Sequence, residues 1–465
     1  MLKKVFTNSF GILFSRITGF LRDLLTASIL GANIYSDIFF IAFKFPNLFR
    51  RIFAEGAFVQ SFLPSYVAAK RKNLFAAYVM MLFLGILLAF SILVTIFSEL
   101  FTKLIAFGFD ENLVTMAAPY VAINFYYLDL IFLVTFLAAL LQHKEHFATT
   151  AFSTALLNIS LIAALLIFGH QEKKELVYAL SYAVLVGGLL QLLVHLYAAR
   201  KKRILKPLIS AIYLLKRRKK EIDEELKRFK KSFFPAIMGN SAPQISAFLD
   251  TWLASFLAAG SISYLYYANR LFQLPLALFA IAAATALFPT VSKKLNSSQT
   301  EEALKIMERY GWMLLFMLSA ASAIGIILSE EIVSLLFERG SFSSSDSEAT
   351  ARILIMYLIG LVPFGLQKLF ALWLYSTHRQ KEAAKIATVS LGTNIALSLA
   401  LIYPLHAAGL ALASSLSGFV LLFLTLKAFG WQRVFSFFKK KYIFYYITSM
   451  VLLSAVLLIC KRVFN

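Results

Sequence analysis

Long apolar stretches recur from one end of the chain to the other, and each has the length of a membrane-spanning helix. A span needs roughly 20 mostly apolar residues. The stretches of this kind are 7–30, 37–67, 75–98, 117–141, 147–168, 176–199, 232–257, 262–290, 309–337, 350–376, 383–403, 407–429 and 441–460. We therefore expect an all-α polytopic membrane protein with about 13 transmembrane helices, and such unbroken apolar runs exclude a β-barrel.

The composition also indicates a membrane protein. Of the 465 residues, 60% are hydrophobic and 15% are charged, whereas an ordinary soluble domain has about 25% charged residues. The net charge of +22 comes from Lys and Arg that gather in the amino-terminal tail and the even-numbered connections. The positive-inside rule then places the amino terminus in the cytoplasm and the carboxyl terminus on the periplasmic side.

The densest basic clusters lie in residues 200–231, where apolar residues separate them. This pattern predicts an amphipathic cytoplasmic linker that lies on anionic membrane lipids. No nucleic-acid recognition motif accompanies the charge, so we expect no nucleic-acid partner.

An internal repeat predicts how the spans are organised. The segments ASIL (27–30) and FLPSYVAAK (62–70) are echoed by ASFL (254–257) and FPTVSKK (288–294), and a proline separates the two segments in each pair. The echo spans an even number of helices, so the two halves are expected to be parallel, as in transporters whose substrate site lies between the repeats. The expected parts are an amino-terminal lobe of six helices at 1–199, the linker at 200–231, a carboxyl-terminal lobe of six helices at 232–430 and one additional helix at 431–465.

The sequence shows no apparatus for ordinary enzyme chemistry. It has a single cysteine, Cys460, and its six histidines lie near expected helix ends rather than at metal-ligand spacing. Phosphate-binding glycine loops, zinc-helix motifs and nucleophile elbows are all missing. We therefore expect a protein that is not an enzyme, with no catalytic residue and no cofactor.

Charged residues interrupt the second apolar stretch, SDIFFIAFKFPNLFRRIFAEGAF. On an ideal helix Asp37, Lys44, Arg51 and Glu55 fall within about 20° of one line, and Asn47 lies nearby. These side chains are therefore expected to form a polar stripe along the helix.

Two arginines complicate this simple pattern. Arg50 lies off the stripe, but Pro46 precedes it by one turn and can bend the helix, so Arg50 stays a candidate for the same cavity as the stripe residues. In the first stretch Arg16 and Asp23 share a face, whereas Arg22 is expected to point elsewhere unless the helix bends.

Cations outnumber acids in these stretches, and the imbalance bears on the substrate. A charge at the bilayer centre costs roughly 2.5–3.5 kcal/mol, so it needs compensation or a function. One interpretation is purely structural, with the acids pairing with some cations and the other cations reaching an interface. The other interpretation is an anionic substrate, because the arginine fork suits phosphate oxygens. The cations are Arg16, Arg22, Lys44, Arg50, Arg51 and Arg270, and the acids are Asp23, Asp37 and Glu55.

Three segments carry a resemblance to a known family. FSRITGFLRDLL, SDIFFIAFKFPNLFRRIFAEGAFVQSFLPSY and SISYLYYANRL resemble the signatures of the MurJ (MviN) family, the lipid II flippases of the MOP transporter superfamily. The similarity extends to about residue 430. It implies a V-shaped, MATE-like alternating-access transporter in the bacterial cytoplasmic (inner) membrane.

The resemblance also implies a substrate and a set of cavity residues. The substrate is lipid II, undecaprenyl-diphosphate-MurNAc-pentapeptide-GlcNAc, carried from the cytoplasmic to the outer leaflet, with cell-wall synthesis proteins as further partners. Between Arg50 and Arg51 it favours Arg50 for the substrate. The residues that match the family's motif positions are Arg16, Arg22, Asp23, Asp37, Arg50, Ser263 and Arg270. The stripe adds Lys44, Asn47 and Glu55 to these candidates.

Two other functions remain open from the sequence. A flippase for another undecaprenyl-diphosphate-linked glycan needs the same arginines, because its substrate carries the same diphosphate. A MATE-type multidrug or cation antiporter fits the two lobes, but it needs an acidic and aromatic cavity.

The energy source is a separate question, and it centres on Asp250 in the seventh stretch. The sequence supplies no cation on the same helix face, so the carboxyl group is either protonated and hydrogen-bonded or binds a coupling ion. In the second case Asn394, with Ser398 or Ser414, would complete an oxygen-only site suited to sodium. Coupling to the membrane potential is the alternative to sodium.

Overall fold

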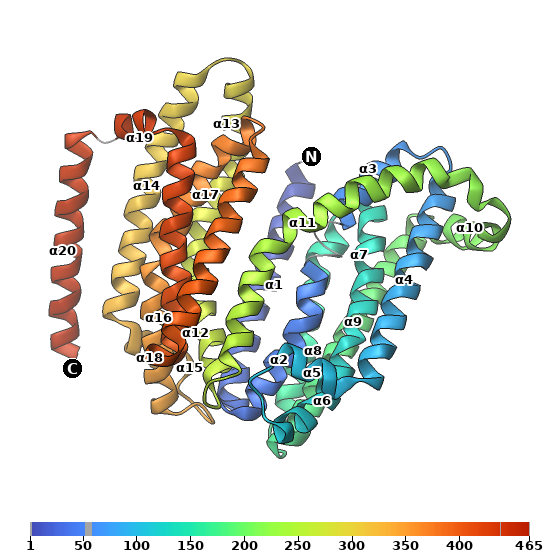
Figure 1. Ribbon diagram of the computed structural model, residues 1–465, viewed down its shortest axis with the longest axis horizontal. Coiled ribbons are helices and arrows are strands. Elements are labelled where there is room, and N and C mark those ends of the chain that lie inside the picture. The colour runs from blue at the N-terminus through green and yellow to red at the C-terminus, as the bar shows by residue number, and fades with distance from the viewer. Residues whose placement is uncertain (1, 52–57, 438, 465) are drawn as a thin grey trace. The chain divides into compact units, whose positions relative to one another are not determined.

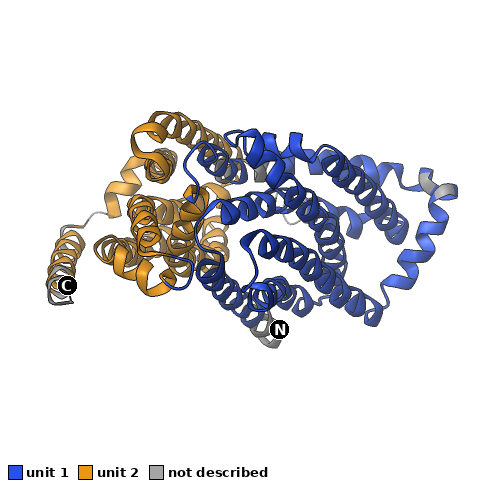
Figure 2. Cartoon of the chain, turned by 90° about the horizontal axis from the view of Figure 1, so that it is seen from below, with its two compact units in different colours: residues 1–260, 339–342 blue, residues 261–338, 343–465 orange. Residues whose placement is uncertain are grey.

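Helices form the regular structure of the computed structural model, which describes residues 2–51, 58–437 and 439–464 (Figure 1). No β-strand occurs within these ranges. The contacts divide the chain into two compact units, coloured separately in Figure 2. The first unit holds Met1–Gly260 with Arg339–Phe342, and the second holds Ser261–Glu338 with Ser343–Asn465. The expected all-α fold is confirmed.

The first unit is built from the helices of the amino-terminal half. They are α1 (Leu2–Leu30), α2 (Ile34–Phe49), α3 (Val59–Ala68), α4 (Lys72–Ile96), α5 (Ser98–Ile105), α6 (Glu111–Phe125), α7 (Tyr127–His143), α8 (Ala148–Phe168), α9 (Lys173–Lys201), α10 (Leu205–Arg218), the 3-10 turn η2 (Lys219–Ile222) and α11 (Asp223–Ala254).

The second unit contains the remaining helices. They are α12 (Ser261–Pro275), the π-helical segment η3 (Leu276–Ile281), α13 (Ala282–Asn296), α14 (Thr300–Ile327), α15 (Ser329–Phe337), α16 (Ser344–Ile359), α17 (Leu361–Ser376), α18 (Gln380–Phe429), α19 (Trp431–Phe437) and α20 (Lys440–Phe464).

Prolines change the helical geometry at matching places in the two units. Pro46 lies inside α2, and Arg50 and Arg51, which follow the end of α2, have π-helical hydrogen bonding. Pro275 ends α12, and the π-helical segment η3 follows directly. Proline lacks the backbone N–H and crowds the preceding turn, so a wider local winding relieves the helix. The paired prolines of the sequence repeat therefore have similar structural consequences.

Helix breaks also recur in the two units. The break between α4 and α5 falls at Phe97 (φ −110°, ψ 39°), and the break between α14 and α15 falls at Leu328 (φ −107°, ψ 27°). The expected spans 117–141 and 350–376 are likewise each divided into two helices, at Tyr126 and Gly360. The nearly identical dihedral angles show that the repeat extends to the backbone geometry.

Eight helical runs are long and apolar enough to cross a membrane, judged by length and composition over the described residues. One of them, α18, covers two expected spans, and it bends at His406 (φ 51°, ψ −134°) just after Pro404. α1 and α11 are not among these eight runs, so thirteen crossings stay a prediction.

The linker at 200–231 folds as α10, η2 and the first turns of α11. Its apolar residues Leu208, Ala211 and Ile222 join the same buried cluster as Leu74 and Phe75 at the start of α4. Most of the apolar stripe thus packs against protein, which the sequence alone did not indicate. α11 continues without a break from Asp223 to Ala254, and the contacts group it with the first unit.

A short segment between α15 and α16 packs on the end of α1. The Ser341 N–H donates to the Ser28 carbonyl oxygen at 2.6 Å. Gly340 adopts a φ of +62°, and a Cβ atom there would lie 2.3 Å from the Ser28 carbonyl oxygen. Both its conformation and its close approach to α1 therefore require glycine.

We expect Gly340→Ala to destabilise the protein by about 1–3 kcal/mol, because the alanine must strain the backbone or push the segment away from α1. The measurement is the thermal unfolding midpoint of the purified chain. Gly392→Ala is the matched control, since Gly392 is helical and no atom beyond its chain neighbours and the nearby backbone of its own helix lies within 4 Å of the added Cβ. Equal midpoints for the two variants would contradict the close-packed contact.

Candidate functional site

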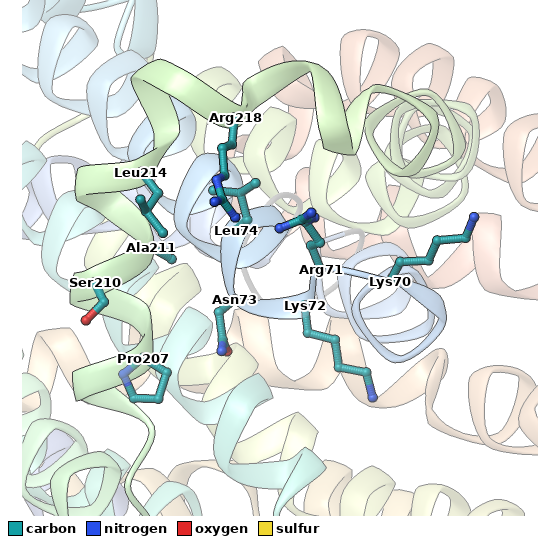
Figure 3. A pocket seen from close by; sticks show the side chains of 10 residues that line it. All are labelled: Lys70, Arg71, Lys72, Asn73, Leu74, Pro207, Ser210, Ala211, Leu214 and Arg218. Atoms are coloured by element: carbon teal, nitrogen blue, oxygen red, sulfur yellow. The ribbon is translucent and has the colours of Figure 1, made fainter.

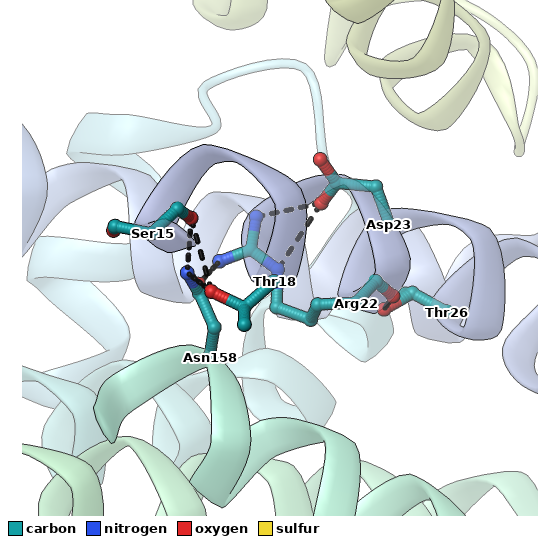
Figure 4. A network of polar contacts seen from close by, with 6 residues as sticks. All are labelled: Ser15, Thr18, Arg22, Asp23, Thr26 and Asn158. Atoms are coloured by element: carbon teal, nitrogen blue, oxygen red, sulfur yellow. Dashed lines mark hydrogen bonds and ion pairs between the residues drawn. The ribbon is translucent and has the colours of Figure 1, made fainter. Parts of the chain in front are cut away.

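A polar network inside the first unit centres on Arg22 of α1 (Figure 4). Arg22 Nη2 lies 2.6 Å from Asp23 Oδ1, and Nε donates to the same oxygen at 3.1 Å. Arg22 Nη1 donates to Asn158 Oδ1 of α8 at 3.2 Å. The Arg22 side chain is 11% exposed and that of Asp23 is 1% exposed. Arg22 thus does not point away from Asp23, as the straight helix suggested, but pairs with it.

Asn158 fixes this arrangement from the neighbouring helix. Its Nδ2 donates to the Ser15 carbonyl oxygen at 3.1 Å and to Thr18 Oγ1 at 3.2 Å. The amide orientation therefore leaves Oδ1 to accept from Arg22. The guanidinium is held between a carboxylate and an amide, which restricts its rotamers before any ligand arrives.

A second polar group joins α2 to α11 within the same unit. Lys44 Nζ donates to Thr251 Oγ1, and Lys44 lies within electrostatic reach of Asp250 and Arg51. Asp250 therefore has a cationic neighbour, which was not expected because that neighbour comes from another helix. Lys44 and Asp250 are both half-buried.

The end of α2 separates the two adjacent arginines. Arg50 is half-buried, and its Nε donates to Asn47 Oδ1 at 3.1 Å. Asn47 Nδ2 donates in turn to the Phe43 carbonyl oxygen at 2.9 Å, which orients the amide. Arg51 is exposed. The expected stripe residue Glu55 lies outside the described residues.

Two other predicted residues of the first unit have different surroundings. Asp37 is 2% exposed, and its Oδ2 accepts the Gly260 backbone N–H at 2.7 Å. This bond ties the start of α2 to the chain that follows α11. Arg16 is exposed on α1. Arg16 and Asp23, which share a face on a straight helix, thus differ in exposure, and Asp23 forms an ion pair with the adjacent Arg22.

The second unit carries the remaining predicted substrate residues on α12. Ser263 is fully buried and Arg270 is half-buried. Seven residues separate them, which is close to two helical turns, so they lie on one face of the helix. Beside Arg270, the Asn269 side-chain oxygen accepts from Gln273 of the next turn.

The residues proposed for a sodium site belong to both units. Asp250 lies in the first unit, whereas Asn394 and Ser414 of α18 lie in the second. Asn394 is 2% exposed, and its Oδ1 accepts from Ser398 at 3.3 Å. No cluster of three or more His, Cys, Asp or Glu that could hold a metal occurs in the described part of the chain. A sodium site made of one carboxylate with amide and hydroxyl oxygens remains a proposal.

Sequence reasoning overlooked three polar residues of the expected spans. Asn158 and Thr251 hold the arginine and the lysine described above. Lys368 lies within the expected span 350–376 and is exposed on α17. No acidic side chain among the described residues forms an ion pair with it. Their position inside apolar runs could have identified them in the sequence, since polar residues are rare in membrane-spanning segments and commonly functional there.

Comparison with known proteins gives consistent results along nearly the whole chain. Residues 26–465 match the family model described as lipid II flippase MurJ. The probable lipid II flippase MurJ of Helicobacter pylori strain J99 is 50% identical over 425 residues, which cover 89% of this chain and 92% of that protein. The corresponding protein of Aquifex aeolicus is 37% identical over 390 residues, covering 82% and 74%.

Solved structures agree on the fold. A lipid II flippase MurJ in an inward closed conformation matches with a TM-score of 0.77 and 24% identity, covering 98% of this chain and 99% of that one. An inward-facing multidrug resistance transporter of the MATE family in the MOP superfamily matches with a TM-score of 0.69 and 13% identity, covering 90% and 94%. At these identities the likeness concerns the fold alone.

Proposed function

The chain belongs to the MurJ family of lipid II flippases, and we propose that it carries lipid II from the cytoplasmic to the outer leaflet of the bacterial inner membrane. The observation that carries this proposal is the largely buried guanidinium of Arg22, whose side chain is 11% exposed and whose orientation is fixed by Asp23 and Asn158. A charged side chain within a membrane-spanning helix has an energetic cost, so its presence there indicates a function.

The charge of the substrate explains why arginine is used. Lipid II carries a diphosphate, and an arginine fork binds phosphate oxygens through paired charge-assisted hydrogen bonds. Arg50 is likewise held by a neighbouring side chain, because Asn47 Oδ1 accepts from its Nε at 3.1 Å. We propose that Arg16, Arg22, Arg50 and Arg270 together neutralise the diphosphate during transport.

Binding must remain reversible for a flippase to work. Asp23 offsets part of the charge of Arg22, so the diphosphate competes with a carboxylate already in place. This competition lowers the affinity and allows release in the other leaflet. The acids proposed for the substrate site, Asp23, Asp37 and Glu55, would thus set the strength of binding, with Lys44, Asn47 and Ser263 positioning the head group.

Complementation tests the proposed function directly. A bacterium depleted of its own lipid II flippase is expected to regain growth and outer-leaflet lipid II when it expresses this chain. Arg50→Lys should restore less transport than the wild type, because lysine keeps the charge but loses the paired hydrogen bonds. The measurement is lipid II labelled from outside the cell, with membrane protein levels matched by immunoblotting.

The control separates this substrate from related ones. A strain that lacks a flippase for another undecaprenyl-diphosphate-linked glycan receives the same chain. Rescue of that strain without rescue of lipid II transport would overturn the proposed substrate while leaving the anionic site in place.

A further inference from the structure

A basic pocket lies between the turn that joins α3 to α4 and helix α10, entirely within the first unit (Figure 3). Its volume is about 540 Å³. The residues that characterise its lining are Lys70, Arg71, Lys72, Ser210, Leu214 and Arg218. The pocket shares no residue with the candidate substrate site, so it is a separate feature of the molecule.

Positive charge exceeds negative charge around this pocket. Four of its lining residues are Lys or Arg, and the lining contains no acidic residue within the described part of the chain. Glu221 of η2 forms ion pairs with Arg71 and, at 3.9 Å, with Arg218. Glu225 accepts the Lys70 backbone N–H at 3.3 Å. Two carboxylates thus face four cations, and the remaining charge favours an anionic ligand.

The pocket also has apolar lining on both sides. Leu74 of α4 and Pro207, Ala211 and Leu214 of α10 contribute it. Tyr213 of α10 is 81% exposed and points away from the buried cluster that holds α10 against α4. A free inorganic anion gains nothing from an apolar wall, whereas a lipid presents a phosphate together with acyl carbon atoms.

The position of the pocket along the chain agrees with a lipid ligand. α4 begins at Lys72 and continues as a membrane-capable helix, so the pocket lies at the end of a span. The distribution of Lys and Arg places this end on the cytoplasmic side, where anionic lipid head groups attract basic clusters. The N-cap residue Arg71 offers no side-chain acceptor to the first turn of α4, and its guanidinium is turned toward Arg218 in Figure 3.

We propose that this pocket binds the phosphate head group of an anionic phospholipid of the inner leaflet and thereby fastens α10 to the α3–α4 turn. The inference does not depend on the transported substrate. Lys72 belongs to the α3–α4 side of the pocket and Arg218 to the α10 side, so a head group that contacts both side chains would bridge the two elements. The linker between α9 and α11 would then be held in place by lipid as well as by its apolar packing.

Native mass spectrometry of the full-length chain in detergent tests the proposal with phosphatidylglycerol and phosphatidylcholine of identical acyl chains. We expect phosphatidylglycerol to bind more tightly, and Lys72→Gln with Arg218→Gln to lower its affinity on the order of tenfold, because two cations near the head group are lost. Lys227→Gln with Arg228→Gln is the matched control. These residues are exposed on α11 outside the pocket, and their loss removes the same charge.

A second variant and a second readout guard against misfolding. Ser210→Asp places a negative charge on the exposed wall and should also weaken phosphatidylglycerol binding. Phosphatidylglycerol should slow hydrogen exchange in residues 205–218 of the wild type but not of Ser210→Asp. Equal affinities for the two lipids, or equal losses in the pocket and control variants, would overturn the proposal. Displacement of the lipid by an equal concentration of inorganic phosphate would overturn the lipid assignment.

Discussion

Arg22→Ala is expected to abolish lipid II transport and to destabilise the first unit. The substitution removes the ion pair to Asp23, whose side chain is only 1% exposed. Breaking a buried pair by removing one partner costs about 3–5 kcal/mol, because the other charge remains buried. The loss of transport is measured by complementation and by outer-leaflet labelling of lipid II, and the loss of stability by the thermal midpoint in detergent.

A double variant separates the structural role of Arg22 from its role in substrate binding. Arg22→Ala with Asp23→Asn removes both charges, so most of the lost stability should return. Transport should still fail, because the diphosphate has lost an arginine. If the double variant transports lipid II normally, Arg22 serves only to pair with Asp23. Arg228→Ala, at an exposed position on α11, is the control for loss of a single arginine and should behave as the wild type.

The helical architecture could be predicted from the sequence because a bilayer leaves few choices. Backbone groups in lipid must be satisfied within each segment, so long apolar runs form helices whatever their detailed sequence. The internal repeat also carried structural information, since the paired prolines precede π-helical winding in both units. Breaks inside apparent single spans, such as those at Tyr126 and Gly360, were not predicted, because the apolar pattern continues across them.

The packing of the linker could not be predicted for a related reason. An amphipathic helix shows which side is apolar but not what covers that side. In α10 the residues Leu208 and Ala211 pack against protein, whereas Ile209 and Tyr213 stay exposed. The sequence shows all four as apolar residues of the linker. Which of them are buried depends on where α4 packs against α10.

The candidate site shows how far a single-helix argument extends. The sequence identified Arg22, Asp23 and Arg50 as charged residues inside apolar runs, and the structure gives each an ordered partner. Asn158, which accepts from Arg22, and Thr251, which accepts from Lys44, come from other helices, so helical spacing along α1 or α2 carried no information about them.

The charged neighbour of Asp250 could not be predicted from its own helix either. A carboxylate without a cation on its own helix face suggested a proton or a sodium ion, whereas Lys44 approaches from α2. We propose that the Lys44 ammonium and a coupling sodium ion compete for this carboxylate, since both are attracted to the same negative charge. Removing the lysine should therefore strengthen sodium binding rather than weaken it.

Lys44→Ala is accordingly expected to lower the sodium concentration needed for half-maximal thermal stabilisation by about tenfold or more. At an effective dielectric constant near 20, repulsion from a neighbouring cation weakens sodium binding by several kcal/mol. Asp250→Asn should abolish the sodium response in both the wild type and the Lys44→Ala background.

The measurement is the thermal midpoint in sodium chloride against potassium chloride at constant ionic strength. It detects binding through linkage and does not require transport, in which Lys44 has a proposed role of its own. Lys227→Ala, an exposed lysine on α11, controls for loss of charge. A midpoint that is indifferent to sodium in both the wild type and Lys44→Ala would instead assign Asp250 to pairing with Lys44 and leave the membrane potential as the energy source.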